Sequence, residues 1–281
     1  MAESNAQTLD APSRRALVVR GTVAFRTLIV ALAVLAWLAL WLWSASPYAR
    51  YLDHGRWTDI GAFAAICRAI PEGDYLVPAT LHALAWVLMI SAMMLPTTLP
   101  ILELFRRMTR ERADGRALLA AVIGGYLVAW LAFGLVAHAA DAGVHALGAR
   151  YPAVSLNGWL IGAAVVALAG AFQFSALKYR CLDQCHTPLG FVLQRWHGRR
   201  PLAEAFRIGI DHGAFCVGCC WALMLLMFVV GAGSIGLMLL LALVMAAEKN
   251  LPWGKRLRTP LGATLLAGSA AIVAWHLVSI G

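Results

Sequence analysis

The chain has 281 residues, of which 61% are hydrophobic and 13% are charged. Soluble domains carry about a quarter charged residues, so this composition excludes an ordinary water-soluble globular protein and is typical of a chain embedded in lipid. The formal net charge of +9 is distributed over short basic runs between apolar stretches, a pattern typical of membrane topology signals, and we expect no nucleic-acid partner.

The N-terminal part predicts a tail followed by a membrane anchor. Residues 1–22 are polar and basic, and we expect a loose cytoplasmic tail without a core of its own. Residues 23–43 are apolar, about the 20 residues that cross the hydrocarbon of a bilayer as a helix. Ser44-Ala45-Ser46 resembles a signal-peptidase site, but the apolar run is too long for a signal peptide. We therefore expect an uncleaved anchor and a single transmembrane domain over residues 23–281.

A mixed loop and a second apolar segment follow. Residues 44–78 contain three prolines and are expected to form a loop. Within this loop, residues 58–70 favour a short interfacial helix, and Cys67 stands there without a partner thiol. Residues 79–102 predict the second span.

The middle of the chain predicts two further spans separated by polar segments. A strongly basic turn at 106–116 precedes an apolar segment at 117–137, and another apolar segment lies at 159–177. Residues 138–157 are expected to form a polar loop, and residues 178–212 are the longest polar segment. The short basic turn makes its two flanking helices antiparallel neighbours.

The C-terminal third contains three shorter apolar stretches. Residues 213–247 hold two of them, interrupted by the small residues at 231–234, and a last span is expected over 261–280 after a basic turn at 255–258. Each half of the interrupted region is near the lower length limit for a crossing. The sequence therefore predicts an all-α, polytopic transmembrane helical bundle of about seven spans, or of five spans plus a re-entrant helical hairpin.

Orientation follows from the basic residues, because loops rich in Lys and Arg stay in the cytoplasm. Of the 23 Lys and Arg residues, all but Arg50, Arg56, Arg68 and Arg150 fall on the side of the N-terminus in this arrangement. We therefore expect a cytoplasmic N-terminus. Five of the six cysteines then lie at the cytoplasmic interface.

These five cysteines form two groups, Cys181 with Cys185, and Cys216 with Cys219 and Cys220. If the fourth helix continues past its apolar part, the first pair has i,i+4 spacing and points to one side. The second group opens the expected fifth span. The sequence leaves open whether the two groups meet in space.

The second cysteine group belongs to a stripe of soft-metal ligands. At 3.6 residues per turn, one face of the helix carries His212, Cys216, Cys220, Met224 and Met227. Thiolate and thioether ligands select copper(I), zinc or iron–sulfur centres over magnesium or calcium. The methionines favour copper(I), whereas a compact Cys/His set would suit zinc. Packing or palmitoylation is the alternative for the cysteines, since Cys is also a common buried residue.

Met89, Met93 and Met94 lie in the second span before Pro96, and together with Met224 and Met227 they are predicted to line a thioether path, with Met93 and Met94 as secondary ligands. A proline-kinked packing helix is the alternative. Glu103 and Glu248-Lys249 lie at span ends, where we expect the carboxylates to face water or to pair with nearby Arg at the interface. A functional intramembrane charge is the alternative. The sequence contains no nucleotide-binding, zinc-protease or serine-nucleophile motif in a suitable context. We therefore expect no enzymatic activity.

Several segments resemble a bacterial family of predicted metal-binding integral membrane proteins, a domain of unknown function sometimes labelled copper chaperone. The resemblance covers about residues 80–255 and is strongest in the last of its four main segments, which is followed by Glu248-Lys249 and Pro252. The four segments are Trp86-x-x-Met89-x-x-x-Met93-Met94-x-Pro96, Gly125-Tyr126-Leu127-x-x-Trp130, Leu177-Lys178-x-x-Cys181-Leu182-x-x-Cys185-x-x-Pro188-Leu189 and Cys216-x-Gly218-Cys219-Cys220-Trp221-Ala222-Leu223-Met224. The resemblance implies metal binding through the Cys and Met positions.

Residues and resemblance together predict a multi-pass protein of the bacterial inner (cytoplasmic) membrane that handles copper(I) for delivery or homeostasis. Its expected partners are the lipid bilayer and either a copper donor or a membrane cuproenzyme. Two alternatives stay open: a membrane subunit with a structural zinc or cofactor site in a larger complex, and a thiol-dependent membrane oxidoreductase. The oxidoreductase would need its cysteines on the oxidising side of the membrane.

Overall fold

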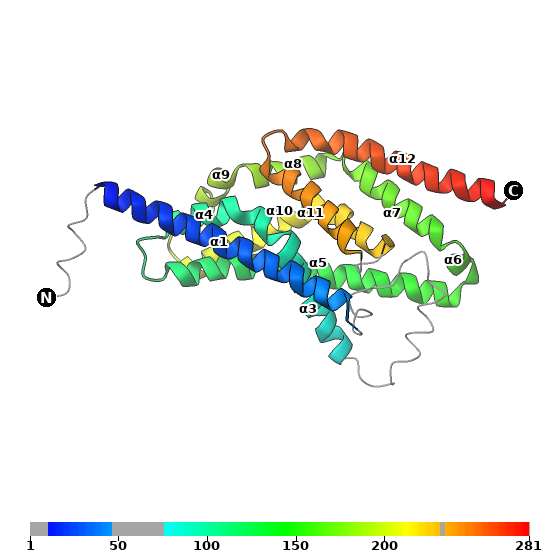
Figure 1. The fold of residues 1–281 in the computed structure, drawn as a ribbon, viewed down its shortest axis with the longest axis horizontal. Helices are drawn as coiled ribbons and strands as arrows, with labels where there is room; N and C mark the ends of the chain where they lie inside the picture. Colours follow the sequence, from blue (N-terminus) through cyan, green and yellow to red (C-terminus); the bar gives the residue numbers. More distant parts are fainter. Residues whose placement is uncertain (1–10, 47–75, 231–233, 281) are drawn as a thin grey trace.

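The structure is a computed structural model that describes residues 11–46, 76–230 and 234–280. All regular elements in these ranges are helices, which confirms the all-α prediction for them (Figure 1). In chain order they are α1 (Ala11–Ser44), α3 (Leu76–Met93), the 3₁₀ turn η3 (Leu95–Thr98), α4 (Leu99–Met108), α5 (Gly115–Arg150), α6 (Pro152–Leu156), α7 (Gly158–Phe172), α8 (Ala176–His186), α9 (Pro188–Leu193), α10 (Pro201–Val230), α11 (Ile235–Asn250) and α12 (Gly254–Ile280). The expected interfacial helix at 58–70 and Cys67 lie outside the described residues.

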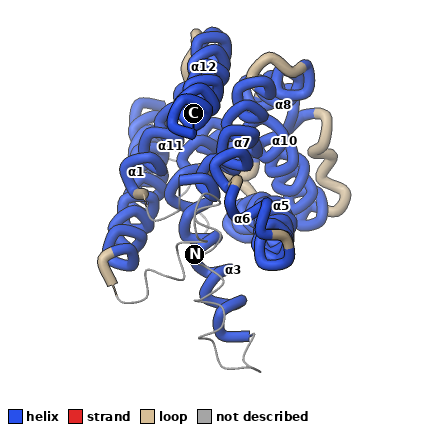
Figure 2. The backbone as a smooth tube through the Cα atoms, turned by 90° about the vertical axis from the view of Figure 1, so that its right-hand side faces the viewer, coloured by secondary structure: helices blue, strands red, loops and turns tan. Residues whose placement is uncertain are grey.

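The long helices form an elongated bundle around α10. In Figure 1, α10 and α11 lie between α5 and α12, and α1 crosses one side of the bundle. Figure 2, which looks along the bundle, shows α10 next to α7 and α8, with α12 and α3 at opposite edges. In its most apolar stretch, α10 has 67% of its residues buried, whereas α12 has 11%. The core therefore surrounds α10, which carries three of the cysteines.

Four helices are long and apolar enough to cross a membrane: α1 from Gly21 onward, α5, α10 and α12. Two bent pairs raise this number to six if each pair is one span, with bends of 49° between α3 and the η3–α4 segment and 60° between α7 and α8. Helix α11 has 16 residues, fewer than the roughly 20 of a full crossing. The described residues thus provide four to six membrane-length segments where the sequence predicts about seven spans.

The outer helices expose apolar side chains that water would solvate poorly. Leu35 and Leu42 of α1 and Trp275, Leu277 and Val278 of α12 are all more than half exposed. Contiguous apolar surfaces of this kind are rare on soluble monomers. The surface therefore fits a lipid environment.

The predicted polar loop at 138–157 is largely helical, so this prediction was wrong, and the polar segment 178–212 is largely helical as well. Helix α5 continues through residues 138–150, and the segment 178–212 contains most of α8, all of α9 and the first twelve residues of α10. Hydropathy identifies the apolar part of a helix and not its ends. Alanine-rich stretches such as 138–150 have high helix propensity although their polar residues lower the hydropathy.

The early start of α10 has a local cause. Pro201 is the first residue of the helix, where its missing N–H costs no hydrogen bond. The Glu204 carboxylate accepts hydrogen bonds from the backbone N–H groups of the four residues at 197–200, at 2.7–3.1 Å. Two other helices also begin earlier than the predicted spans: α1 begins at Ala11, within the expected tail, and α12 begins at Gly254.

Helices α5 and α10 cross at glycines. A Cβ at Gly125 of α5 would overlap the backbone oxygen of Phe206, and a Cβ at Gly209 of α10 would overlap the backbone oxygen of Val122. Small residues at such crossings let two helix backbones approach closely. This contact fixes α10 against α5 about two turns before the cysteines.

The bend between α3 and α4 places Met94 in the interior. Residues 95–98 form a 3₁₀ turn with Pro96 near its start, as expected where proline interrupts a helix. The hydroxyl of Thr97 donates to the Met94 carbonyl at 2.7 Å, and the hydroxyl of Thr98 donates to the Leu95 carbonyl at 2.7 Å. The Met94 carbonyl also accepts the backbone N–H of Thr97 at 3.1 Å, so the turn and the threonine hydroxyls together supply hydrogen bonds at the break.

Candidate metal centre

The cysteine group of α10 lies in the middle of its helix. Cys216, Cys219 and Cys220 are at most 2% exposed. The helix begins at Pro201, so Cys216 lies about 22 Å along its axis at 1.5 Å per residue. The thiols of Cys219 and Cys220 donate to the carbonyl oxygen of Cys216 at 3.1 and 2.8 Å. The group is therefore deeper than the start of a span, where the sequence places it.

A buried ammonium group lies among the sulfur atoms. Lys249 of α11 is 5% exposed, and its Nζ lies 2.8 Å from Cys216 Sγ, 3.7 Å from Cys220 Sγ and 3.6 Å from Met94 Sδ. These sulfurs come from α10 and from the break after α3. A charge buried this deeply needs polar or charged partners, and sulfur atoms supply them here.

Aromatic and imidazole groups complete one side of the centre. The Tyr126 hydroxyl of α5 lies 3.2 Å from Cys216 Sγ. The ring of His212, one turn before Cys216, stacks on the Tyr126 ring at 5.9 Å between centroids, and Phe191 packs edge-on against it. His212 is 6% exposed, and its Nδ1 atom has no hydrogen-bond partner among the described residues. One ring nitrogen of His212 is thus buried without a partner, next to the thiols.

The structure brings the cysteine pair of α8 to the cysteines of α10. A Cβ added to Gly218 would lie 2.7 Å from Cys181 Sγ, so the absence of a side chain at Gly218 lets the two helices approach. The thiols of Cys185 and Cys219 are neighbours that interact electrostatically. The two cysteine groups therefore meet at the contact between α8 and α10.

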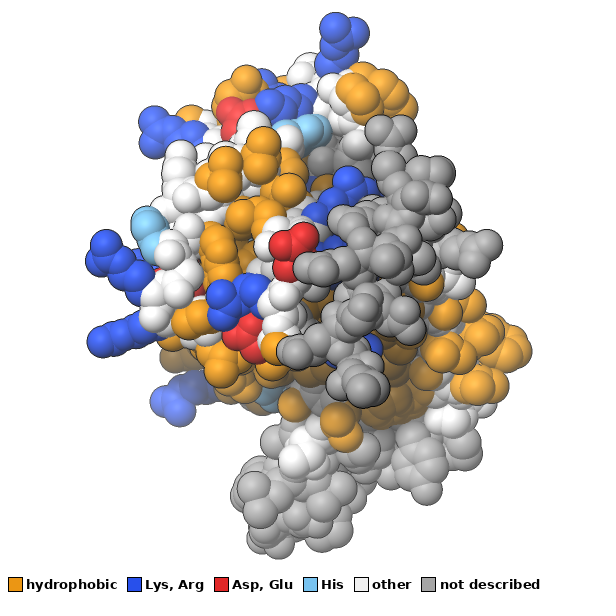
Figure 3. Space-filling view, turned by 90° about the vertical axis from the view of Figure 1, so that its left-hand side faces the viewer, with side chains coloured by type: hydrophobic (Ala, Val, Ile, Leu, Met, Phe, Trp, Pro, Cys, Tyr) orange, Lys and Arg blue, Asp and Glu red, His pale blue; other side chains and the backbone are white. Residues whose placement is uncertain are grey.

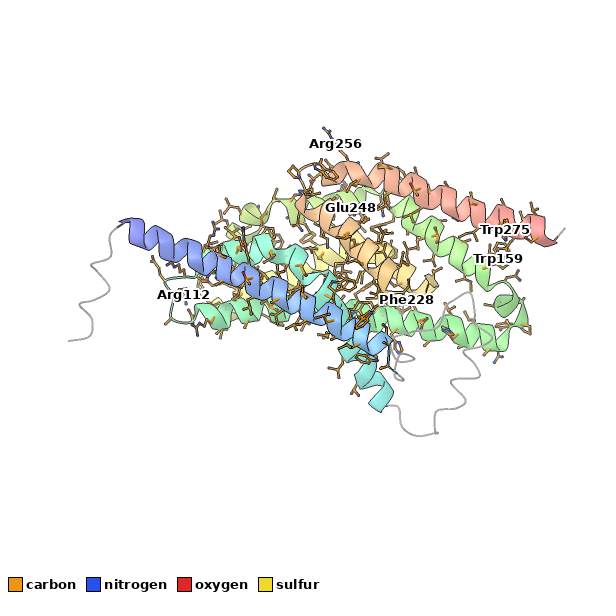
Figure 4. The ribbon with its side chains drawn as sticks, in the orientation of Figure 1. Arg112, Trp159, Phe228, Glu248, Arg256 and Trp275 are labelled. Carbon is orange, nitrogen blue, oxygen red and sulfur yellow. The ribbon has the colours of Figure 1, made fainter. Side chains whose placement is uncertain are left out.

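A buried ion pair holds α8 against α11. The Nζ of Lys178 lies 2.7 Å from a carboxylate oxygen of Glu248, and these side chains are 0% and 3% exposed. Lys178 also donates to the side-chain oxygen of Gln173. A ring nitrogen of His186 lies 2.9 Å from the Glu248 carbonyl oxygen. Figure 4 labels Glu248 near the end of α11.

The prediction that Glu248 and Lys249 face water or pair at the interface was wrong, because both side chains are buried. Consecutive residues of a helix point in different directions, and α11 ends between two cysteine-bearing helices. Glu248 therefore reaches Lys178 of α8, and Lys249 reaches Cys216 of α10. Glu103 keeps an expected partner: its carboxylate accepts a hydrogen bond from Arg26 Nη2 at 2.8 Å.

The methionines gather in the same interior. The four predicted ligands Met93, Met94, Met224 and Met227 are at most 3% exposed. Three further methionines are also buried, namely Met89, Met238 and Met245. Met89 belongs to the predicted thioether path of the second span. Met238 and Met245 were not predicted as ligands, although they are seven residues apart and share a helix face with Lys249.

Tyr126 and Lys178 were not predicted as parts of the centre, and a functional charge at Glu248-Lys249 was only the alternative. Tyr126 lies in an apolar segment, and Lys178 and Lys249 were counted as topology signals. The available signal was their position inside or next to apolar segments, where an ionisable side chain is costly and commonly functional.

The donors fit a soft monovalent cation. Two thiol sulfurs and one thioether sulfur surround the ammonium of Lys249, which carries a single positive charge. Copper(I) has the same charge and prefers such sulfur donors. Among the described residues, no three Cys, His, Asp or Glu side chains stand at metal-ligand spacing. A metal ion would therefore bind here only if the side chains rearranged around it.

Comparison with known proteins identifies the family. The family PpoB2, described as copper chaperone, matches residues 83–272, a range that contains both cysteine groups, the seven buried methionines and Lys249. The comparisons with curated proteins and with solved structures gave no match. The match covers more than half of the chain, and it agrees with the resemblance of the Cys and Met segments. The chain therefore belongs to the copper chaperone family PpoB2.

Proposed function

We propose that this chain is an integral membrane protein that binds copper(I) through sulfur ligands and hands the ion to a partner. The observation that carries the proposal is the group of sulfur atoms around Lys249, formed by Cys216, Cys220 and Met94. Cys185 and Cys219 adjoin this group. Family membership supports copper as the ion.

Ligand exchange among neighbouring sulfur atoms would let the protein transfer the copper(I) ion without releasing it into solution. Copper(I) held by two or three sulfurs moves to the next ligand when a new Cu–S bond forms before an old one breaks, and its oxidation state does not change. The thiols lose their protons when the metal binds. The contact between Cys185 and Cys219 supports exchange between α8 and α10.

The membrane arrangement is part of the proposal. The chain spans a bacterial inner membrane several times with its N-terminus in the cytoplasm, and α11 adds a seventh segment to the six membrane-length ones. Lys and Arg side chains gather at the end of the molecule seen in Figure 3, which includes the turn before α5. Trp159 and Trp275 lie near the opposite end, and Arg112 lies at the basic end (Figure 4). This polarity supports the orientation, since basic loops stay in the cytoplasm and Trp favours interfaces.

A copper donor or a membrane cuproenzyme is the proposed partner, and the handover needs no enzymatic activity. One contact supports a different function. The adjacent thiols of Cys185 and Cys219 are also the arrangement that a thiol-dependent oxidoreductase would use, because a disulfide forms only between neighbouring thiols. A structural zinc site in a larger complex is the other alternative.

Metal content tests the proposal against these alternatives. The full-length protein is purified in detergent under reducing conditions, and its copper and zinc are measured before and after incubation with copper(I). We expect copper to be taken up stoichiometrically. Bound zinc that copper(I) does not displace would contradict the proposal and favour a structural site. Mass-resolved alkylation showing a Cys185–Cys219 disulfide that cycles with a substrate would favour the oxidoreductase.

A further inference from the structure

One face of α10 carries soft-metal ligands over much of the helix length. His212, Cys216, Cys220, Met224 and Met227 are all 6% exposed or less. They span about fifteen residues of a continuous helix, or about 22 Å at 1.5 Å per residue. The hydrocarbon of a bilayer is about 30 Å thick. We call these five residues the ligand stripe of α10.

A second row of sulfur atoms lies on α11. Met238, Met245 and Lys249 follow one another at spacings of seven and four residues, which places them on one helix face. They are at most 5% exposed. The row meets the ligand stripe at its Lys249 end, where the ammonium contacts Cys216 and Cys220.

Helix α3 contributes a third set. Met89 and Met93 are one turn apart, Met94 contacts Lys249, and all three are buried. Helix α11 contacts both α3 and α10, and α3 meets α10 farther along, where the rings of Trp86 and Phe228 lie 6.3 Å apart. The seven buried methionines therefore lie on three helices that contact one another. Six of them belong to these helices, and Met94 follows the last residue of α3.

Methionine is distributed unevenly among the helices, which is not expected if its side chains only fill space. The long apolar helices α1, α5 and α12 contain none, and their buried positions hold residues such as Leu, Val and Ala. Leucine has about the same volume as methionine and more defined rotamers. Thioethers concentrate where the thiols and Lys249 lie, which links them to the proposed copper ligands.

We propose that the sulfur atoms between α3, α10 and α11 form a route along which copper(I) crosses the membrane, so that the chain is a copper conduit as well as a binding protein. This inference rests on the proposed function, because the thiols around Lys249 load the route. Beyond them, the ion passes between neutral thioethers. Thioethers bind copper(I) without a negative charge, so the ion stays mobile there. It remains copper(I) throughout and moves down its gradient.

Flux into proteoliposomes tests the route. Full-length protein is reconstituted with a copper(I)-specific chelating dye trapped inside, and copper(I) is added outside with a reductant. The route variant is Met238→Leu/Met245→Leu, which keeps side-chain volume and leaves the predicted ligands of α10 unchanged. The matched control is Met108→Leu, because Met108 is 36% exposed and lies outside the route. Copper(I) binding is titrated for each protein in detergent.

We expect wild type and Met108→Leu to fill the liposomes at least tenfold faster than empty liposomes fill, and the route variant to lose most of this flux while still binding copper(I). Stoichiometric binding by a wild type without flux would overturn the route and leave the proposed function standing. Flux unchanged in the route variant would overturn the methionine path. A wild type that neither binds nor conducts would overturn both proposals. If the double variant unfolds, the flux and binding of the single variants Met238→Leu and Met245→Leu are judged by the same criteria.

Discussion

The ammonium nitrogen of Lys249 lies 2.8 Å from the sulfur of Cys216, inside the bundle where α11 meets α10. A copper(I) ion bound by the thiolates of Cys216 and Cys220 would carry a net charge of −1. A buried charge of this kind is costly unless an opposite charge lies close to it. Lys249 supplies that charge, and its four-carbon side chain is flexible enough to leave room for the ion.

Replacement of Lys249 by leucine should therefore weaken copper(I) binding. We expect Lys249→Leu to lose at least tenfold in affinity, about 1.4 kcal/mol, and Lys249→Arg to lose less because it keeps the charge. Competition titration with a copper(I) chelator measures the difference. Lys255→Leu is the control, because Lys255 pairs with Asp183 and is not part of the sulfur group around Lys249. Equal affinity of Lys249→Leu and wild type would refute the charge-balancing role.

Removal of one partner from the Lys178–Glu248 pair should destabilise the protein. Lys178→Met leaves a buried carboxylate without its counter-charge, which costs about 3–5 kcal/mol in comparable sites. The double variant Lys178→Met/Glu248→Met should recover much of the loss. Thermal unfolding in detergent reports both, with Arg112→Gln as a control on an exposed pair where no measurable change is expected. A Lys178→Met protein that unfolds at the wild-type temperature would contradict this account.

A methyl group at Gly218 should separate the two cysteine groups. The added Cβ would lie 2.7 Å from Cys181 Sγ, closer than van der Waals contact allows, so the Cys181 thiol must turn away or α8 must shift, and either change disturbs the contact between the two groups. Oxidative cross-linking between Cys185 and Cys219 should then fall several-fold, as measured by peptide mass spectrometry. Gly124→Ala is the matched control, because a Cβ there meets no atom within 4 Å. Unchanged cross-linking in Gly218→Ala would show that the contact is looser than the structure indicates.

Copper(I) binding should weaken as the pH falls. The metal replaces thiol protons, so acidification favours the proton-bound form and opposes binding. Each proton released lowers the apparent affinity by about tenfold per pH unit while the thiols are protonated. Titrations at several pH values give this slope. Binding that does not depend on pH would indicate that thiols are not the ligands.

The fold class and the predicted ligands of α10 could be predicted from the sequence, because both depend on local residue patterns. Apolar composition identifies membrane-type helices, and the four-residue spacing from His212 to Cys220 is enough to place these side chains on one helix face. The helix ends were misplaced at 138–150 and 201–212, since hydropathy does not register a polar helical extension. The Glu204 carboxylate caps the start of α10 by accepting hydrogen bonds from the backbone at 197–200. Hydropathy does not detect such a cap, because it involves only polar groups.

The charged part of the centre depends on tertiary contacts, which one sequence does not specify. Lys178 and Glu248 are 70 positions apart, and Lys249 and Met94 are 155 apart. A lysine next to an apolar segment equally fits a cytoplasmic loop. Only the packing of α8 and α10 around the end of α11 distinguishes a buried lysine from a topology signal.

The most direct test of the central claim is a copper(I) titration of reduced, detergent-purified protein. Wild type is compared with a variant in which Cys216, Cys219 and Cys220 are all changed to serine, and thermal unfolding verifies that the variant is folded. We predict tight, stoichiometric binding by wild type and its loss in the folded variant. Substoichiometric binding by wild type, or equal binding by both proteins, would contradict the claim that these thiols hold copper.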